Sequence, residues 1–68
     1  MANDFDIKLD SKGEYYWILN AGNGEPLCRS TDGYTTKASC EHSINVTKVL
    51  APTASVWDLT VDPPKKIQ

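Results

Sequence analysis

The shortness of the chain is the feature that most limits what it can fold into. A compact monomer of 68 residues buries only about 60% of the surface that its unfolded chain exposes. The free energy gained by burying apolar surface then barely offsets the conformational entropy that is lost on folding. Chains of this size therefore usually gain stability from a metal, from disulfide bonds or from a second subunit.

The numbers of cysteines and histidines argue against the first two of these sources of stability. Cys28 and Cys40 are the two cysteines, and His42 is the one histidine, so a single subunit cannot build a four-ligand zinc site from Cys and His. The N-terminal residues lack the basic flank and apolar stretch of a signal peptide. We therefore expect a cytoplasmic protein with two buried thiols, although a Cys28–Cys40 disulfide remains an alternative. The sequence predicts no metal and no cofactor, which leaves association with a second subunit.

Charge and hydropathy exclude two classes of partner. The net charge is −2, and the seven Lys and Arg residues are scattered along the chain, whereas nucleic-acid binders of this size usually carry a basic excess. No apolar run approaches the roughly 20 residues of a membrane-spanning helix. We expect neither a nucleic acid nor a membrane as a partner.

The residues that could catalyse a reaction form no recognisable constellation. Cys40 and His42 are a nucleophile and a base by type, but residues two apart on a helix project to nearly opposite sides. No serine lies in the Gly-x-Ser-x-Gly context of a nucleophile elbow. The sequence therefore predicts no catalytic residue and no enzyme.

Hydrophobic alternation predicts three strands in the first half of the chain. Residues 5–9 alternate apolar and polar side chains, and residues 14–20 are rich in aromatic and β-branched ones. The turn formers of residues 10–13 lie between them, so we expect a hairpin. Residues 25–31 predict a third strand, in which Pro26 fits an edge position or a strand start.

The second half of the chain begins with a helical pattern. Residues 36–48 are predicted to form a helix, with a threonine as its N-cap. Pro52 interrupts the chain, and residues 55–61 alternate like a fourth strand. Residues 62–68 are polar and rich in proline, and we expect a flexible tail. The predicted fold is α+β, in the order β-β-β-α-β with an antiparallel sheet.

An ordered series of short motifs resembles the YegP-like family of small uncharacterised proteins. The matching residues extend over about positions 4 to 60 and are Gly13-Glu14-Tyr15, Trp17, Leu19, Ala21, Asn23-Gly24, Leu27, Ser30, Tyr34-Thr35, Lys37-Ala38, Ile44, Val46-Thr47-Lys48, Ala51 and Val56-Trp57-Asp58-Leu59. The resemblance implies a single β(3)-α-β domain over residues 1–61. It also implies a homodimer whose subunits form one sheet and exchange their C-terminal strands. It supplies no biochemical activity.

Two groups of apolar residues are candidate interaction sites. The resemblance places Val56, Trp57 and Leu59 on the exchanged strand, and we expect them at the dimer interface. Tyr16 and Ile18 alternate with the expected core residues of the second strand and face the other side of the sheet. An apolar pair there can dock an unidentified protein partner; the alternative is that residues 63–68 or the second subunit cover it.

These expectations define a small homodimer that acts through protein contacts. An alternative is the binding of a small molecule in a cleft at the dimer seam, lined by Trp57 and Tyr34. The residues themselves name neither a partner nor a ligand.

Overall fold

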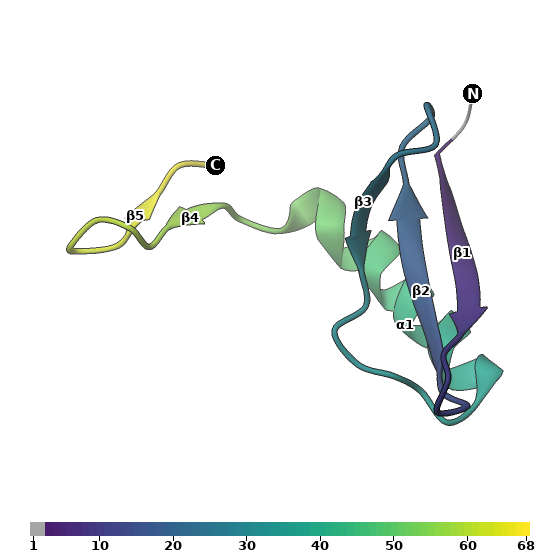
Figure 1. Ribbon diagram of the computed structural model, residues 1–68. Helices are drawn as coiled ribbons and strands as arrows, with labels where there is room; N and C mark the ends of the chain where they lie inside the picture. The colour runs from purple at the N-terminus through teal and green to yellow at the C-terminus, as the bar shows by residue number, and fades with distance from the viewer. Residues whose placement is uncertain (1–2) are drawn as a thin grey trace.

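The computed structural model describes residues 3–68 and shows an antiparallel three-stranded sheet with one helix on one of its faces (Figure 1). The strand order is β1-β2-β3, and β4 and β5 form a separate two-stranded pair. The elements are β1 (Asp4–Leu9), β2 (Tyr15–Asn20), β3 (Pro26–Arg29), α1 (Lys37–Leu50), the single 3₁₀ turn η1 (Ala51–Thr53), β4 (Trp57–Asp58) and β5 (Lys65–Lys66). The predicted α+β class and antiparallel sheet are confirmed.

The predicted first hairpin is present, and its turn explains its register. The Asp10 carboxylate accepts hydrogen bonds from the backbone N–H groups of Lys12, at 2.8 Å, and Glu14, at 3.0 Å. Gly13 has a φ of 81°, which glycine adopts without steric cost. The turn pairs Ile7 with Trp17, and both side chains lie on the face that the helix covers.

The third strand is shorter than predicted, because a serine interrupts it. Ser30 is buried, and its backbone N–H donates to the Trp17 carbonyl at 3.0 Å. Its hydroxyl accepts from the Trp17 N–H at 3.2 Å and donates to the Asp32 carbonyl at 3.1 Å. The strand therefore ends at Arg29. The chain meets β2 again at Tyr34, which forms an isolated antiparallel β-bridge with Tyr15.

The helix begins as predicted and ends two residues later than predicted. The Thr36 hydroxyl caps it by accepting from the Ser39 N–H at 3.1 Å. The helix continues through Ser43, whose hydroxyl donates to the Cys40 carbonyl at 2.8 Å and thus has a partner within the helix. Pro52 lies in η1, where its missing N–H is tolerated because the first N–H groups of a helix have no intrahelical partner.

The core of the single chain is very small. Trp17 and Cys40 are its buried apolar residues among those described. The Trp17 ring meets Phe5 edge to face, with centroids 5.2 Å apart, and its Nε1–H donates to the Ser43 hydroxyl at 2.9 Å. The helix contacts β1 and β2, which explains why Cys40 is buried as predicted. The prediction that Cys28 is buried is wrong, because α1 contacts β1 and β2 but not β3.

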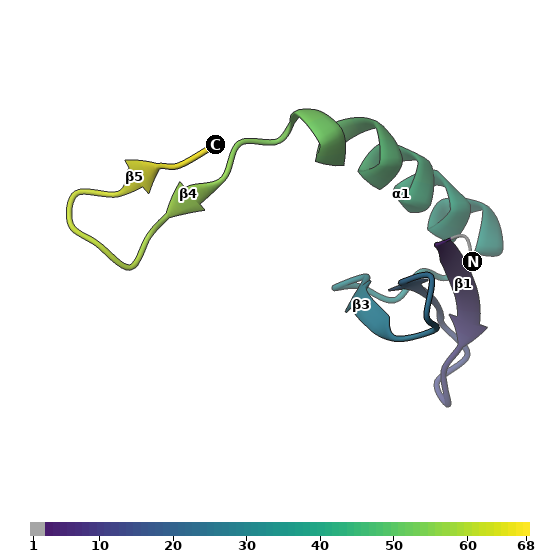
Figure 2. The ribbon, with the colours of Figure 1, turned by 90° about the horizontal axis from the view of Figure 1, so that it is seen from above.

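The last fifteen residues differ most from the prediction. Residues 54–68, which we call the arm, lead away from the sheet and the helix (Figures 1 and 2). The strand predicted over residues 55–61 is reduced to Trp57–Asp58, and Lys65–Lys66 pairs with it where a flexible tail was expected. The radius of gyration is 14.7 Å, against about 11 Å for a compact domain of this length.

Candidate functional site

The direction of the arm is set at the end of the helix. The Ala54 N–H donates to the Ala51 carbonyl at 3.3 Å and closes η1. Ala54 then adopts an extended conformation, with a ψ of 135°, and the chain continues outward. Within residues 3–68, β4 and β5 contact each other and no other strand or helix. The arm therefore has no packing surface in its own subunit.

The arm carries apolar side chains that water surrounds in the single chain. The predicted interface residues Val56, Trp57 and Leu59 all lie on it, with Trp57 54% exposed and Leu59 73% exposed. Val61 and Ile67 are exposed as well. Full burial of an apolar side chain of this size gains about 1.5–3 kcal/mol, so a surface that covered the arm would stabilise the protein strongly.

One edge of β4 is paired and the other is unpaired. The Val56 N–H donates to the Gln68 carbonyl at 3.0 Å, and the Ile67 N–H donates to the Val56 carbonyl at 2.9 Å. Both backbone groups of Val56 thus face residues 67–68, which continue from β5, and because such groups alternate along a strand, those of Trp57 face the opposite edge. A hairpin this short is not stable alone in water.

The turn after β4 is held by an aspartate. The Asp58 carboxylate accepts hydrogen bonds from the hydroxyl and the backbone N–H of Thr60. The hydroxyl bond, followed by the backbone bond, lowers the pKa of Asp58 below its usual value. The carboxylate is therefore ionised at neutral pH, and the turn keeps its acceptor.

The folded part of the chain has an apolar surface that nothing covers. The second half of α1 exposes Val46, Val49 and Leu50, which line a shallow groove of about 340 Å³ together with Asn45. Their spacing of three and four residues places them on one face of the helix. This spacing is visible in the sequence, where Val46 belongs to the family resemblance and Val49 and Leu50 carry no predicted role.

The strand β3 is also uncovered and lies at an edge of the sheet. It pairs only with β2, and all four of its residues are exposed. Leu27 is 65% exposed. Figure 2 shows the helix and the sheet as two layers, with the second half of α1 extending toward the arm. An unpaired edge strand and an apolar helix face are thus both available to an added strand.

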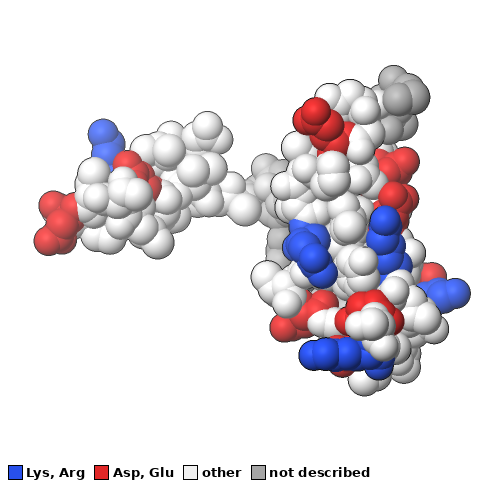
Figure 3. All heavy atoms as spheres, viewed as in Figure 1, with Lys and Arg blue, Asp and Glu red and all other residues white. Residues whose placement is uncertain are grey.

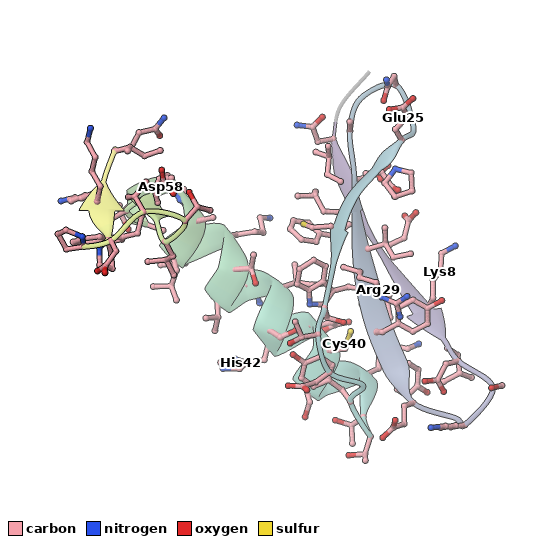
Figure 4. The ribbon with its side chains drawn as sticks, turned by 60° about the vertical axis from the view of Figure 1, so that its left-hand side comes forward. Lys8, Glu25, Arg29, Cys40, His42 and Asp58 are labelled. Atoms are coloured by element: carbon pink, nitrogen blue, oxygen red, sulfur yellow. The ribbon has the colours of Figure 1, made fainter. Side chains whose placement is uncertain are left out.

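The predicted docking residues lie on the sheet face that is opposite the helix. Tyr16 and Ile18 are half-buried there, and the Arg29 guanidinium lies 4.8 Å from the centroid of the Tyr16 ring. Lys8 is paired with Tyr16 across the strands, and Figure 4 shows Lys8 and Arg29 on the same side of the sheet. Figure 3 views this face and shows basic side chains near its middle. The face therefore combines an aromatic ring with two cations.

The candidate nucleophile and base are not brought together. Cys40 is fully buried against the sheet, and burial raises the pKa of its thiol, to which the neighbouring Glu41 carboxylate adds. His42 is exposed and projects from the helix away from the strands (Figure 4). Both cysteines are free thiols. Among residues 3–68, no three His, Cys, Asp or Glu side chains are grouped so that they could hold a metal ion.

The proposed lining of a seam cleft is likewise separated within one chain. Trp57 lies on the arm, whereas Tyr34 lies beside β2. The backbone N–H of Tyr34 donates to the Tyr15 carbonyl, and the Tyr15 N–H donates to the Tyr34 carbonyl, both at 2.7 Å.

None of the helical segments described here has the length and apolar character needed to cross a bilayer.

One known protein family matches most of this chain. A family model described as a domain of unknown function, DUF1508, matches residues 10–58. The chain belongs to the DUF1508 family. The matched segment extends from the first turn to the end of β4, so it includes the helix and the start of the arm.

Several DUF1508 relatives are similar over most of their length. A UPF0339 protein of Neisseria meningitidis serogroup B is 43% identical over 44 residues, which cover 65% of this chain and 77% of that protein. A UPF0339 protein of Agrobacterium fabrum is 41% identical over 56 residues, or 82% and 89% of the two chains. A solution structure of a protein from Haloferax volcanii superposes with a TM-score of 0.77 at 32% identity and covers 82% of this chain and 93% of that one. These matches confirm the YegP-like assignment and an uncharacterised biochemical role.

Proposed function

We propose that this DUF1508 protein is a homodimer whose subunits exchange their arms, and that it acts through protein contacts and not through catalysis. The proposal rests on the exposure of the arm and on its lack of packing within its own chain. The arm exposes Trp57 and Leu59 to water, and its two strands pack against no strand or helix of residues 3–53. The folded part of each copy has an uncovered apolar surface, and the arm of the second copy can pack against it.

The exposed area supports a partner of this size. The single chain exposes 5412 Å², whereas a compact monomer of this mass exposes about 4,250 Å². The excess is roughly 1,100 Å² for each chain, and thus about 2,300 Å² for a pair, which lies within the range of obligate homodimers. Two arms that pack against two subunits would remove an area of this order.

The arm and the uncovered surface of the folded part are complementary. The unpaired edge of β4 can add to the unpaired edge of β3 in the second copy. A strand in that position lies beside Leu27 and below the second half of the partner's helix, where Val49 and Leu50 are exposed. Trp57 and Leu59 then enter the apolar groove of that helix. The contact is reciprocal, so it closes with two-fold symmetry.

The mass of the protein in solution tests the dimer. Light scattering over a concentration series should give twice the 7.5 kDa of the chain at micromolar concentrations. The fluorescence of Trp57 should shift to shorter wavelength as the dimer forms, because the indole leaves water. A single species of 7.5 kDa at high micromolar concentration would contradict the proposal.

The protein contact is proposed for the outer face of the sheet, where Tyr16 and Ile18 lie. The helix covers the other face, so this one stays open when the arms are exchanged. A Tyr16→Glu/Ile18→Lys variant should keep the fold and the dimer mass and lose the protein that co-purifies with the wild type. A variant that keeps both its fold and every such protein would rule out this face.

A further inference from the structure

We propose that β5 terminates the sheet of the exchanged dimer, so that each arm can be joined along one edge only and association stops at two subunits. This inference rests on the proposed arm exchange and adds a role for residues 63–68. Without β5, an arm docked beside β3 would itself become the new edge of the sheet. That edge would be an exposed apolar strand, which readily pairs with another sheet.

The hydrogen bonds show that β5 occupies the edge in question. The two backbone groups of Val56 bond the residues directly after β5: its N–H donates to the Gln68 carbonyl at 3.0 Å, and its carbonyl accepts from the Ile67 N–H at 2.9 Å. Lys65 and Lys66 pair with Asp58 and Trp57. The edge of β4 that remains unpaired is therefore the one that the second copy's β3 can reach, and the opposite edge is filled by the same chain.

The outer edge of β5 is poorly suited to pair with a further strand. Pro63 and Pro64 precede it and have no N–H to donate. The Ile67 N–H faces β4, so alternation turns the Lys66 N–H outward and leaves few outward donors. Lys65 and Lys66 are both exposed, and Figure 3 shows a basic side chain at this end of the arm. Lysine, proline and short length are devices that protect sheet edges.

The terminating strand lies beyond the segment that the family model matches. The match to the DUF1508 model ends at residue 58, the last residue of β4. β5 lies wholly beyond that point, so the strand-exchange element and the element that ends the sheet are separate segments of sequence. One can be removed while the other is kept.

Truncation tests the inference directly. A chain that ends at Asp62 should still form the dimer, but its mass by light scattering should rise above twice 7.5 kDa as the concentration increases. The full chain should hold the dimer mass over the same range. Thioflavin T fluorescence should increase with the truncated chain only, because it reports added β-strands.

Two proline variants of the full chain keep the test falsifiable if the truncated chain does not fold. Ile67→Pro removes the N–H that bonds Val56 at 2.9 Å and should reproduce the growth in mass. Lys66→Pro removes an outward N–H and should stay dimeric. The inference is overturned if the truncated chain and Ile67→Pro remain dimers of constant mass, or if both become monomers. If the full chain is itself a monomer, the proposed dimer fails, which is a separate result.

Discussion

Replacing Trp57 with alanine should weaken the dimer until it dissociates at the concentrations where the wild type is fully associated. Large aromatic side chains at the centre of an interface commonly contribute about 2–4 kcal/mol, or about 30- to 900-fold in Kd at 1.36 kcal/mol per tenfold change. A two-fold symmetric dimer contains two copies of the contact. The free-energy loss therefore counts twice, and the factor in Kd for one contact is squared. Sedimentation equilibrium over a dilution series measures the change.

The control for this variant is Leu9→Ala. Leu9 is 59% exposed, close to the 54% of Trp57, but it lies at the end of β1 and not on the arm. Its replacement should leave Kd within a few-fold of the wild type. An unchanged Kd for Trp57→Ala, with the fold preserved by circular dichroism, would show that the arm does not form the interface.

Replacing Trp17 with alanine should remove most of the stability of the folded part. The truncation of a buried Trp to Ala costs about 3–5 kcal/mol, and a chain of this length has about 3–10 kcal/mol in total. The variant loses the edge-to-face contact with Phe5 and leaves the Ser43 hydroxyl without the Nε1–H donor. Urea unfolding followed by circular dichroism, at one fixed protein concentration, should show the transition at much lower urea.

Two further variants separate the parts of this effect. Ser43→Ala leaves the Trp17 Nε1–H without its partner and should cost about 1–3 kcal/mol. Tyr16→Ala changes the neighbouring residue of β2 on the opposite face and should cost less than Trp17→Ala, because Tyr16 is only half-buried. A loss below about 1 kcal/mol for Trp17→Ala would mean that the core lies elsewhere.

Local patterns predicted the first hairpin and the start of the helix correctly. The alternation of residues 5–9 and the turn residues around Gly13 determine the pairing of β1 with β2, because neighbouring segments must share one buried face. The Thr36 cap and the burial of Trp17 likewise depend on residues close in sequence or on one strand. Interactions of this kind are readable from spacing alone.

Predictions that depended on what lies beside a strand were less successful. The expected fourth strand is reduced to Trp57–Asp58, because no edge within residues 3–53 pairs with it. Cys28 is exposed because the helix contacts β1 and β2 and does not contact β3. Ser30 and Ser43 gained their roles from Trp17, which is 13 and 26 residues away, and no local signal marks such partners.

The sequence by itself determined the α+β class, the β1-β2 hairpin, the capped helix and the need for stabilisation beyond one small core. Each of these follows from residue spacing, intrinsic preference or chain length. Only the tertiary structure decided that the arm packs against no strand or helix of residues 3–53, that β5 returns along β4, and that the second half of α1 stays uncovered. These features depend on which strand edges and helix faces remain uncovered after the local elements have packed. The packing of the whole chain determines them.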